Sequence, residues 1–395
     1  MTTRITVEVG APAHGGHCVA RHEGRAVFVR HALPGETVVA EVEDDAPDAR
    51  FWKAETVEVL EASPDRVEHP WPEAGAGGIG GAELGHASLD AQRRWKHAVL
   101  VEAFERFAGV AFEGAVHAAP GDDARGGLAY RTRVSATAGE DGRPSMVVPS
   151  TGERRALIEM PLAVSEAETA LLKARTAPGN RIDVTATSTG ELAVTTTGRE
   201  ARELWLNERI VHGDGELAYR VRAADFWQVH REAPRVLVDA VMSRILTDGP
   251  VLDLYSGAGL FALPVAVAGR PVVAVEAPER GAAPPALAAN LKGRAGAEAI
   301  GADVRQYLMR AATTRDWTDA SIVLDPPRAG AKARNIAALA ALGAPRIVYV
   351  ACDPVALARD TALLRDEGYD LIEAQAHDLF PMTHHIETVA SFTRR

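Results

Sequence analysis

Hydrophobic and polar positions alternate with one period in the first part of the chain and with another in the last part. From about residue 221, short apolar runs are separated by helical stripes, such as Leu237, Val241 and Ile245 in a predicted helix over 233–246. Strands that are apolar on both faces and alternate with helices are typical of a doubly wound, mostly parallel sheet. We therefore predict an α/β domain over 221–395. Its expected strands are 251–255, 271–276, 321–324, 346–350, 371–374 and 386–392.

Residues 1–61 show the two-residue period of short strands instead. Predicted strands over 5–9, 26–30, 37–42 and 53–59 are separated by glycine- and proline-containing turns. This spacing predicts a small OB-type β-barrel, and such barrels often bind single-stranded nucleic acid. Residues 4–31 contain four arginines and four histidines but only two acidic residues, Glu8 and Glu23. This locally positive face is equally compatible with a merely solvated surface.

Residues 62–220 have a mixed pattern. The proline- and glycine-rich stretch 69–81 is typical of a linker or a long loop. A helix is expected over about 89–107, with three basic residues near its start, and strands are expected over 128–134, 182–187 and 191–196. We predict a middle α+β domain, whose topology the pattern does not define.

Composition narrows the class of protein. The 395 residues are 47% hydrophobic and 25% charged, with no apolar run of membrane-spanning length and no apolar signal core at the start. The two cysteines provide no disulfide framework. We therefore expect a cytoplasmic monomer without membrane association. The net charge is 43 − 54 = −11, which counts against nucleic-acid binding that depends on overall charge alone. Binding to RNA would therefore need local basic patches.

The first strand of the α/β domain leads into a glycine-rich turn, Asp253-Leu-Tyr255-Ser-Gly257-Ala-Gly259-Leu-Phe261. Glu276 ends the next strand, where a carboxylate can accept both hydroxyls of a ribose. Ala262 stands where the third glycine of a dinucleotide-binding fingerprint belongs. Alanine is sometimes allowed at this position, so a nicotinamide cofactor is not excluded by this turn alone. The Asp-x-Tyr-x-Gly-x-Gly form nevertheless favours S-adenosylmethionine. Asp303 is compatible either with a contact to adenine or with an ordinary loop-end aspartate.

Three residues at the ends of later strands are candidates for chemistry. Asp325 opens the rigid turn Asp325-Pro-Pro-Arg328, Cys352 lies between a strand and a helix, and Glu387 lies on the last strand. Taken alone, Cys352 is more often a buried structural residue and Glu387 a solvated one. Together, a thiolate, a carboxylate base and a methyl donor suit methylation at a pyrimidine carbon, because thiolate addition at C6 of uracil makes C5 nucleophilic. Such chemistry requires an unstacked base.

At this point the sequence resembles the RNA uracil-5-methyltransferase family, whose members act on 23S ribosomal RNA or on transfer RNA. The resemblance covers essentially the whole chain, and residues 1–61 resemble its RNA-binding TRAM domain. It implies a seven-stranded Rossmann-like methyltransferase sheet, Cys352 as the nucleophile and Glu387 as the proton acceptor. It also implies that Gln228, Tyr255, Glu276 and Asp325 bind S-adenosylmethionine or frame the uracil. The residues themselves add Gly257, Gly259 and Asp303 to the predicted cofactor site. The matching segments are 14–21, 32–36, 226–229, 253–261, 325–330, 351–354 and 385–389.

Two departures from the family pattern change the expectations. Some members hold an iron–sulfur cluster on four cysteines, but residues 69–86 contain none and Met160-Pro161 lies near the fourth position. We therefore expect no cluster and no other metal. Leu260 stands where members often carry asparagine, which removes one expected hydrogen bond to the cofactor.

Ribosomal RNA is favoured over transfer RNA, because the transfer-RNA branch in many bacteria lacks the barrel. Three other functions remain open. A cytosine-C5 methyltransferase of RNA would often have a second cysteine beside the Pro-Pro turn, which is absent here. An RNA-binding or chaperone protein with a silent catalytic domain is compatible with Leu260 and the acidic charge. A nicotinamide dehydrogenase would leave Cys352 and Glu387 unexplained.

Overall fold

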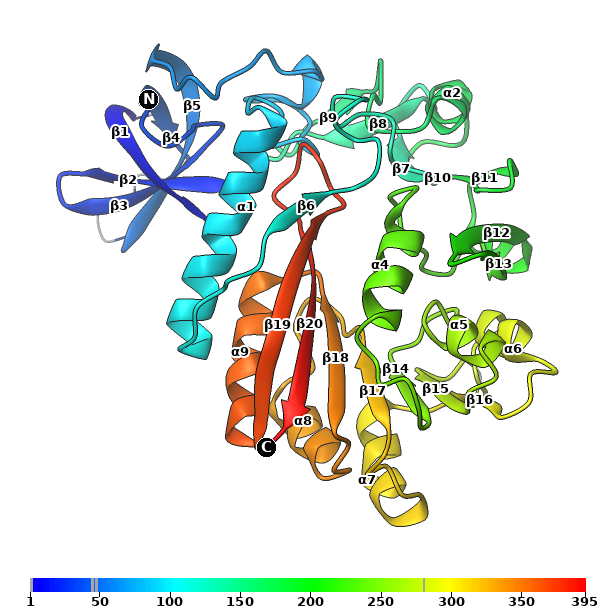
Figure 1. Ribbon diagram of the computed structural model, residues 1–395. Helices are drawn as coiled ribbons and strands as arrows, with labels where there is room; N and C mark the ends of the chain where they lie inside the picture. The colour runs from blue at the N-terminus through cyan, green and yellow to red at the C-terminus, as the bar shows by residue number, and fades with distance from the viewer. Residues whose placement is uncertain (1–2, 44–45, 47–48, 280) are drawn as a thin grey trace. The chain divides into compact units, whose positions relative to one another are not determined.

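A computed structural model describes residues 3–43, 46, 49–279 and 281–395 of the chain (Figure 1). These residues divide into two compact units. The first unit comprises residues 1–99, 120–184 and 380–385, and the second comprises 100–119, 185–379 and 386–395. Neither unit is one continuous segment. The predicted division into 1–61, 62–220 and 221–395 therefore stays a prediction, and the compact units follow a different partition of the chain.

The first unit contains a closed five-stranded barrel, in the order β1-β2-β3-β5-β4. Its inward side chains are small or β-branched, such as Val7, Val27, Val29, Val38 and Ala40, and all are fully or almost fully buried. This confirms the predicted barrel and adds a strand, β2, that the alternation had not revealed. The strands are β1 (Arg4–Ala13), β2 (His17–His22), β3 (Arg25–Arg30), β4 (Thr37–Val42) and β5 (Phe51–Glu61).

The rest of the first unit surrounds the start of helix α1 (Leu89–Ala103). The stretch 69–81 is not a linker, because Trp71, Ala74 and Ile79 are buried and a short 3₁₀ helix, η1 (Pro72–Ala74), lies within it. Apolar side chains between the glycines anchor the loop, a signal that composition alone had hidden. The remaining elements are β7 (Arg133–Ala138), β8 (Pro144–Val147), β9 (Arg154–Ala156), α2 (Ser165–Lys173) and β10 (Arg181–Ala186).

The second unit is built on an eight-stranded sheet, in the order β16-β15-β14-β17-β18-β20-β19-β6. The first five of these strands are parallel, while β20 lies antiparallel between β18 and β19 (Figure 1). The predicted doubly wound α/β fold is confirmed, and a short strand from the middle of the chain, β6 (Val116–Ala118), is added as an eighth strand beside β19. The other strands are β14 (Val251–Leu254), β15 (Val272–Glu276), β16 (Ala297–Gly301), β17 (Ser321–Leu324), β18 (Arg346–Ala351), β19 (Tyr369–Asp378) and β20 (Glu387–Arg394).

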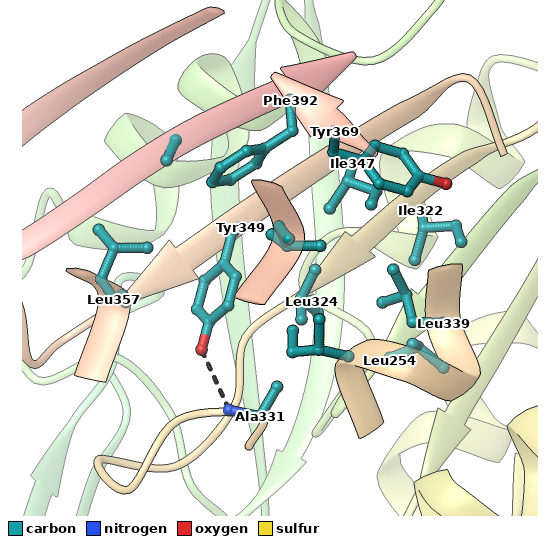
Figure 2. Close-up of a cluster of buried hydrophobic side chains, with 14 of the residues drawn as sticks. Leu254, Ile322, Leu324, Ala331, Leu339, Ile347, Tyr349, Leu357, Tyr369 and Phe392 are labelled. Carbon is teal, nitrogen blue, oxygen red and sulfur yellow. Dashed lines mark hydrogen bonds between the residues drawn. The ribbon is translucent and has the colours of Figure 1, made fainter. Parts of the chain in front are cut away.

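One large apolar core fills the space between this sheet and three of its helices, α7 (Val304–Thr314), α8 (Ala333–Ala340) and α9 (Pro354–Asp366). Figure 2 shows the part of the core around Tyr349, whose hydroxyl meets the backbone N–H of Ala331 inside the apolar cluster. The end of α1 and the π-helical turn η2 (Phe104–Ala108) add to the same core. The central strands β14 and β17 are buried along their whole length, and β18 is buried from Ile347 onward, as the apolar runs predict.

The other elements of the second unit are a short strand, a hairpin and four helices. The hairpin of β12 (Trp205–His212) and β13 (Gly215–Arg222) was not expected from the sequence. The remaining elements are β11 (Leu192–Thr195), α3 (Gly198–Glu203), α4 (Ala233–Met242), α5 (Ala262–Val267) and α6 (Pro285–Leu291). Within the described residues, each helix is too short or too polar to cross a lipid bilayer.

Candidate active site

The predicted catalytic residues come from neighbouring strands of the second unit's sheet. The strands β14, β17 and β18 run parallel and in register, with Leu254 beside Leu324 and Leu324 beside Tyr349. Asp325 therefore leaves the sheet at the edge from which Tyr255 also leaves, and its backbone N–H donates to the carbonyl of Leu254 over 3.3 Å. Ligands of such sheets bind beyond this carboxyl edge.

Antiparallel pairing brings Glu387 to the same edge. In the β18–β20 ladder, Val350 pairs with Val389 and Ala351 with Thr388. Cys352 and Glu387 are the residues immediately beyond this last pair, and the charge of Glu387 acts on the Cys352 thiol. Insertion of β20 between β18 and β19 is thus what brings the thiol and the carboxylate together.

Burial and mutual repulsion raise the pKa of the carboxyl groups at this edge. Asp325 is desolvated and faces the charge of Glu276, which raises its pKa to about 7. The pKa of Glu387 lies well above its usual range, because Glu387 is desolvated and feels the charge of Asp325, while Arg328 opposes the shift. Asp253, which is fully buried, also has a raised pKa. The edge therefore favours carboxyl groups that take up protons near neutral pH.

The Cys352 thiol is half-buried and precedes α9, whose N-cap is Asp353 with its carboxylate accepting from Ala356 N–H at 2.8 Å. Desolvation is the largest cause that raises the pKa of Cys352 to about 12; the charges of Glu387, Asp325 and Asp353 act in the same direction, and Arg328 opposes them. The electrostatics of the folded site therefore favour the neutral thiol of Cys352. A nucleophile of this kind must lose its proton to a nearby base as it attacks.

The glycine-rich turn after β14 has the backbone strain of a ligand-binding loop. Tyr255 has φ +60°, a conformation that costs energy in residues other than glycine, and Gly257 and Gly259 have φ +54° and +88°. A Cβ atom at Gly257 would meet open space, so only backbone conformation requires glycine there. The predicted glycine turn thus has the local geometry expected of it.

Glu276 has acceptor sites that ribose hydroxyls can donate to. One carboxylate oxygen accepts from Gly257 N–H at 2.8 Å and the other from Ala277 N–H at 2.7 Å. A carboxylate offers about four lone-pair sites, so each oxygen keeps one for a ligand hydroxyl. The residues present at the carboxyl edge therefore fit a nucleoside such as that of S-adenosylmethionine.

The other two predicted cofactor residues have different settings. Gln228 is buried in the segment that leads from β13 towards α4. Asp303 is the N-cap of α7, with its carboxylate accepting from Gln306 N–H at 3.0 Å, which is the structural role considered as its alternative. Desolvation raises the pKa of Tyr255, and the charge of Asp303 acts on it in the same direction.

Sequence reasoning missed the residues that hold the loops of the site in shape. Asn335 Nδ2 donates to the Tyr255 hydroxyl at 2.9 Å, and the buried Asn290 donates to the Ala258 carbonyl at 2.8 Å. Asp360 on α9 accepts from the Tyr349 hydroxyl and from Ala331 N–H, each at 2.6 Å, and so fastens the end of the Pro-Pro turn to the helix that follows Cys352. No local pattern distinguishes these residues from ordinary helix or strand positions.

Comparison with known families and proteins agrees with this arrangement. Residues 200–395 match the family model described as tRNA (uracil-5-)-methyltransferase, and residues 2–55 match the TRAM domain. An RNA methyltransferase of Bifidobacterium longum is 39% identical, with 98% of this chain and 96% of that protein covered. A 23S rRNA (uracil(1939)-C(5))-methyltransferase of Alkalilimnicola ehrlichii is 32% identical, with 97% and 95% covered.

Among solved structures, the chain shares its fold with the Pyrococcus abyssi tRNA (uracil-54, C5)-methyltransferase, which was crystallised with S-adenosyl-L-homocysteine. The TM-score is 0.72 at 22% identity, over 98% of this chain and 99% of the other. The fold, the TRAM match and the full-length relatives point to one conclusion: the chain belongs to the S-adenosylmethionine-dependent RNA uracil-5-methyltransferase family.

Proposed function

We propose that this protein methylates C5 of a uridine in 23S ribosomal RNA through a covalent adduct between Cys352 and C6 of the base. The observation that supports the proposal is the pairing of β18 with β20, whose last pair is followed directly by Cys352 and Glu387 at the sheet edge where ligands of this fold bind. S-adenosylmethionine, when bound, supplies the electrophilic methyl group.

The electrostatics of the site indicate how the nucleophile is activated. Because the pKa of Cys352 is raised to about 12, the thiol is protonated in the resting site. Attack on C6 forms the Sγ–C6 bond, moves the C5=C6 electron pair towards O4, and passes the thiol proton to a base. The carboxylates of Asp325 and Glu387, whose charges act on Cys352, are the bases that this edge offers.

The second half of the reaction needs a base at C5. After C5 has accepted the methyl group, its hydrogen must leave as a proton so that the C6–Sγ bond can break and the double bond can return. Glu387 is nine-tenths or more buried and its pKa is raised, which makes its carboxylate a strong proton acceptor. Arg328 opposes this rise and so favours the ionised form that can take the proton.

The choice of ribosomal RNA rests on the relatives. The matching proteins named for uracil 1939 of 23S ribosomal RNA include chains that are 32% and 31% identical over almost their full length. The structural neighbour named for transfer RNA is 22% identical, which supports the fold alone. We therefore propose the uridine that corresponds to position 1939 as the target.

One face of the barrel offers a surface for this RNA. The face includes His17, Phe28, Arg30, Phe51 and Lys53, which point outward because Val27 and Val29 point inward. Glu55, the ladder partner of Arg30, lies on the same side and is paired with His31. The Phe28 and Phe51 rings meet edge to face with centroids 5.3 Å apart, and Phe51 is 48% exposed. In barrels that bind single-stranded RNA, the bases stack on aromatic rings and the phosphate backbone is bound by cationic side chains.

An RNA that carries 5-fluorouridine at the target position tests the covalent step. Fluorine at C5 cannot leave as a proton does, so the methylated adduct should persist and survive denaturing electrophoresis. We expect the adduct with the unaltered protein and with Cys18→Ala, which removes the other, barrel-core cysteine. We expect none with Cys352→Ala, whose methyl transfer should fall by on the order of 10³-fold or more. An adduct formed by Cys352→Ala would refute the proposed nucleophile.

The target is tested separately. 5-methyluridine would be mapped across total RNA from cells that contain the protein and from cells that lack it. Loss of the modification at 23S position 1939 alone is expected. Loss from transfer RNA, with 23S ribosomal RNA unchanged, would overturn the choice of target but leave the chemistry standing.

A further inference from the structure

A cluster of potential metal ligands lies in the first unit, and none of its residues has a role in the reaction proposed for Cys352 and Glu387. It consists of Glu83, His384 and His385, each partly exposed. One ligand atom from each residue lies within 4.8 Å of the other two. Among the described residues, no other group of three or more histidine, cysteine, aspartate or glutamate side chains meets this spacing.

The segment 380–385 that carries the two histidines is held firmly by the rest of the first unit. Lys96 Nζ donates to the Phe380 carbonyl at 3.0 Å, and the Tyr130 hydroxyl donates to the Pro381 carbonyl at 3.0 Å. The Met382 carbonyl accepts a hydrogen bond from Leu84 N–H at 2.8 Å, and Met382 N–H donates one to Gln92 Oε1 at 2.7 Å. The two histidines therefore stand on a fixed backbone, which a metal site requires.

Glu83 is fixed against the same segment. Its carboxylate accepts from His384 N–H at 3.1 Å and also contacts His384 Nδ1. The rings of His384 and His385 have centroids 4.1 Å apart. A cation that entered between Glu83 and His384 would separate the two contacting atoms to about 3.3 Å, the spacing of ligands in a tetrahedral site.

The turn between β1 and β2 closes one side of the cluster. His14 on this turn meets the His384 ring edge to face, with centroids 6.3 Å apart. A Cβ atom at Gly16 would lie 2.9 Å from Glu83 Cγ and 3.4 Å from His384 Nδ1, so the backbone of the turn approaches the ligands closely. His14 is therefore a neighbouring imidazole that could add a further ligand, and solvent can supply a ligand in its place.

We propose that Glu83, His384 and His385 bind one Zn²⁺ ion. Imidazole and carboxylate ligands in this number suit zinc and its neighbours in the first transition row, whereas Mg²⁺ and Ca²⁺ prefer all-oxygen sites. The proposal departs from the expectation of no metal drawn from the sequence, in which Glu83 and His384 are 301 positions apart.

A simple ion pair between Glu83 and His384 is the rival interpretation, and the chain contains a matched control for it. His212 and Asp239 in the second unit form such a pair, with Nδ1 and Oδ1 2.7 Å apart. Among the described residues, no third histidine, cysteine or carboxylate joins them at the spacing of the Glu83 cluster. Zinc should therefore distinguish the two pairs.

The test titrates tag-free, full-length protein, first treated with a chelator, with Zn²⁺ by calorimetry and native mass spectrometry. We expect one Zn²⁺ per chain, a higher midpoint of thermal unfolding when zinc is added, and no response to Mg²⁺. Co²⁺ used as a probe should give the visible bands of a tetrahedral complex. Absence of zinc binding by the unaltered chain would refute the site.

Variants assign the ligands. His384→Ala, His385→Ala and Glu83→Gln should each weaken zinc binding by about tenfold or more, while His212→Ala should bind zinc as the unaltered protein does. Circular dichroism establishes that each variant is folded, and Glu83→Gln keeps a side chain of the same size, so its loss of zinc cannot be ascribed to a cavity. Equal zinc affinity in Glu83→Gln, His385→Ala and the unaltered protein would overturn the assignment.

Discussion

The carboxyl edge of the second unit's sheet and the outer face of the barrel use charged side chains in opposite ways. At the sheet edge, Asp253 and Glu387 are withdrawn from water, and their pKa values are raised. On the barrel face, Phe51 is 48% exposed and lies on the same side of the strands as Lys53. One region holds acidic groups out of solvent, while the other leaves cations and aromatic rings at the surface.

The difference is the one expected if the sheet edge moves protons and the barrel face binds RNA, as proposed. Moving a proton at neutral pH requires groups whose pKa is shifted, and burial is the means of shifting it. Binding a phosphate backbone requires cations that can exchange solvent ions for phosphates, which they do at the surface. A net charge of −11 is therefore compatible with RNA binding at the proposed barrel face, because cations act locally on a nearby phosphate.

The largest effect is expected at the acidic edge, where Glu387→Gln should separate methyl transfer from product release. The variant keeps the size of the side chain but cannot remove the C5 proton, so turnover should fall by about 10²–10⁴-fold while the methylated adduct on Cys352 accumulates. Denaturing electrophoresis with unmodified RNA and labelled S-adenosylmethionine measures the adduct. Glu367→Gln, an exposed position at the end of α9, should behave as the unaltered protein. Normal turnover in Glu387→Gln would remove this residue from the mechanism.

A smaller effect is expected at the barrel face. Phe51→Ala removes an exposed ring that offers a stacking platform, so RNA affinity should fall by about 1–3 kcal/mol. The rate of methyl transfer at saturating RNA should change little. Ile158→Ala is the control, since Ile158 is 76% exposed and outside the barrel. Equal RNA affinity in the two variants, measured by filter binding at fixed salt, would exclude the barrel face as the RNA surface.

The last prediction concerns the pH dependence of stability, which tests whether the carboxyl groups of the sheet edge are desolvated. The pKa of Asp325 is raised to about 7 in the folded protein, so folding favours its protonated form. That contribution to the free energy of unfolding is fully present below about pH 4 and is lost as pH rises through about 7. Relative to the unaltered protein, Asp325→Asn should therefore gain stability between about pH 4 and pH 7. Denaturant unfolding measures the difference, and Asp366→Asn, an exposed site on α9, should show none. A flat difference for Asp325→Asn would mean that the carboxyl group is not buried as described.

The fold was largely predictable because its strongest signals are periodic. Strands such as Ser321–Leu324 and Arg346–Ala351 are apolar along most of their length, and in a chain of alternating strands and helices that pattern is typical of parallel strands buried on both faces. Short or polar elements escaped prediction. β6 (Val116–Ala118) has three residues, and it pairs with β19, which comes much later in the sequence. The β12–β13 hairpin is local: its strands alternate exposed and buried positions on either side of a turn that contains Gly213 and Gly215.

The candidate site divides in the same way. The strand-end positions of Asp325, Cys352 and Glu387 could be located from sequence, because parallel strands share one carboxyl edge. Their raised pKa values could not, since burial of the carboxylates and the opposing effect of Arg328 arise only from the folded edge. Asp360 and Asn335, which fasten the loops, also look like ordinary helical residues until their partners are known.

The position of β20 has a consequence for how the protein is made. This strand follows every other described strand of the sheet in the sequence, yet it lies between β18 and β19. During synthesis, the edges of β18 and β19 that face β20 therefore stay unpaired until Glu387–Arg394 leaves the ribosome. Glu387, the residue proposed as the base, begins that strand. A nascent chain therefore completes its sheet and gains the proposed catalytic carboxylate in one late step.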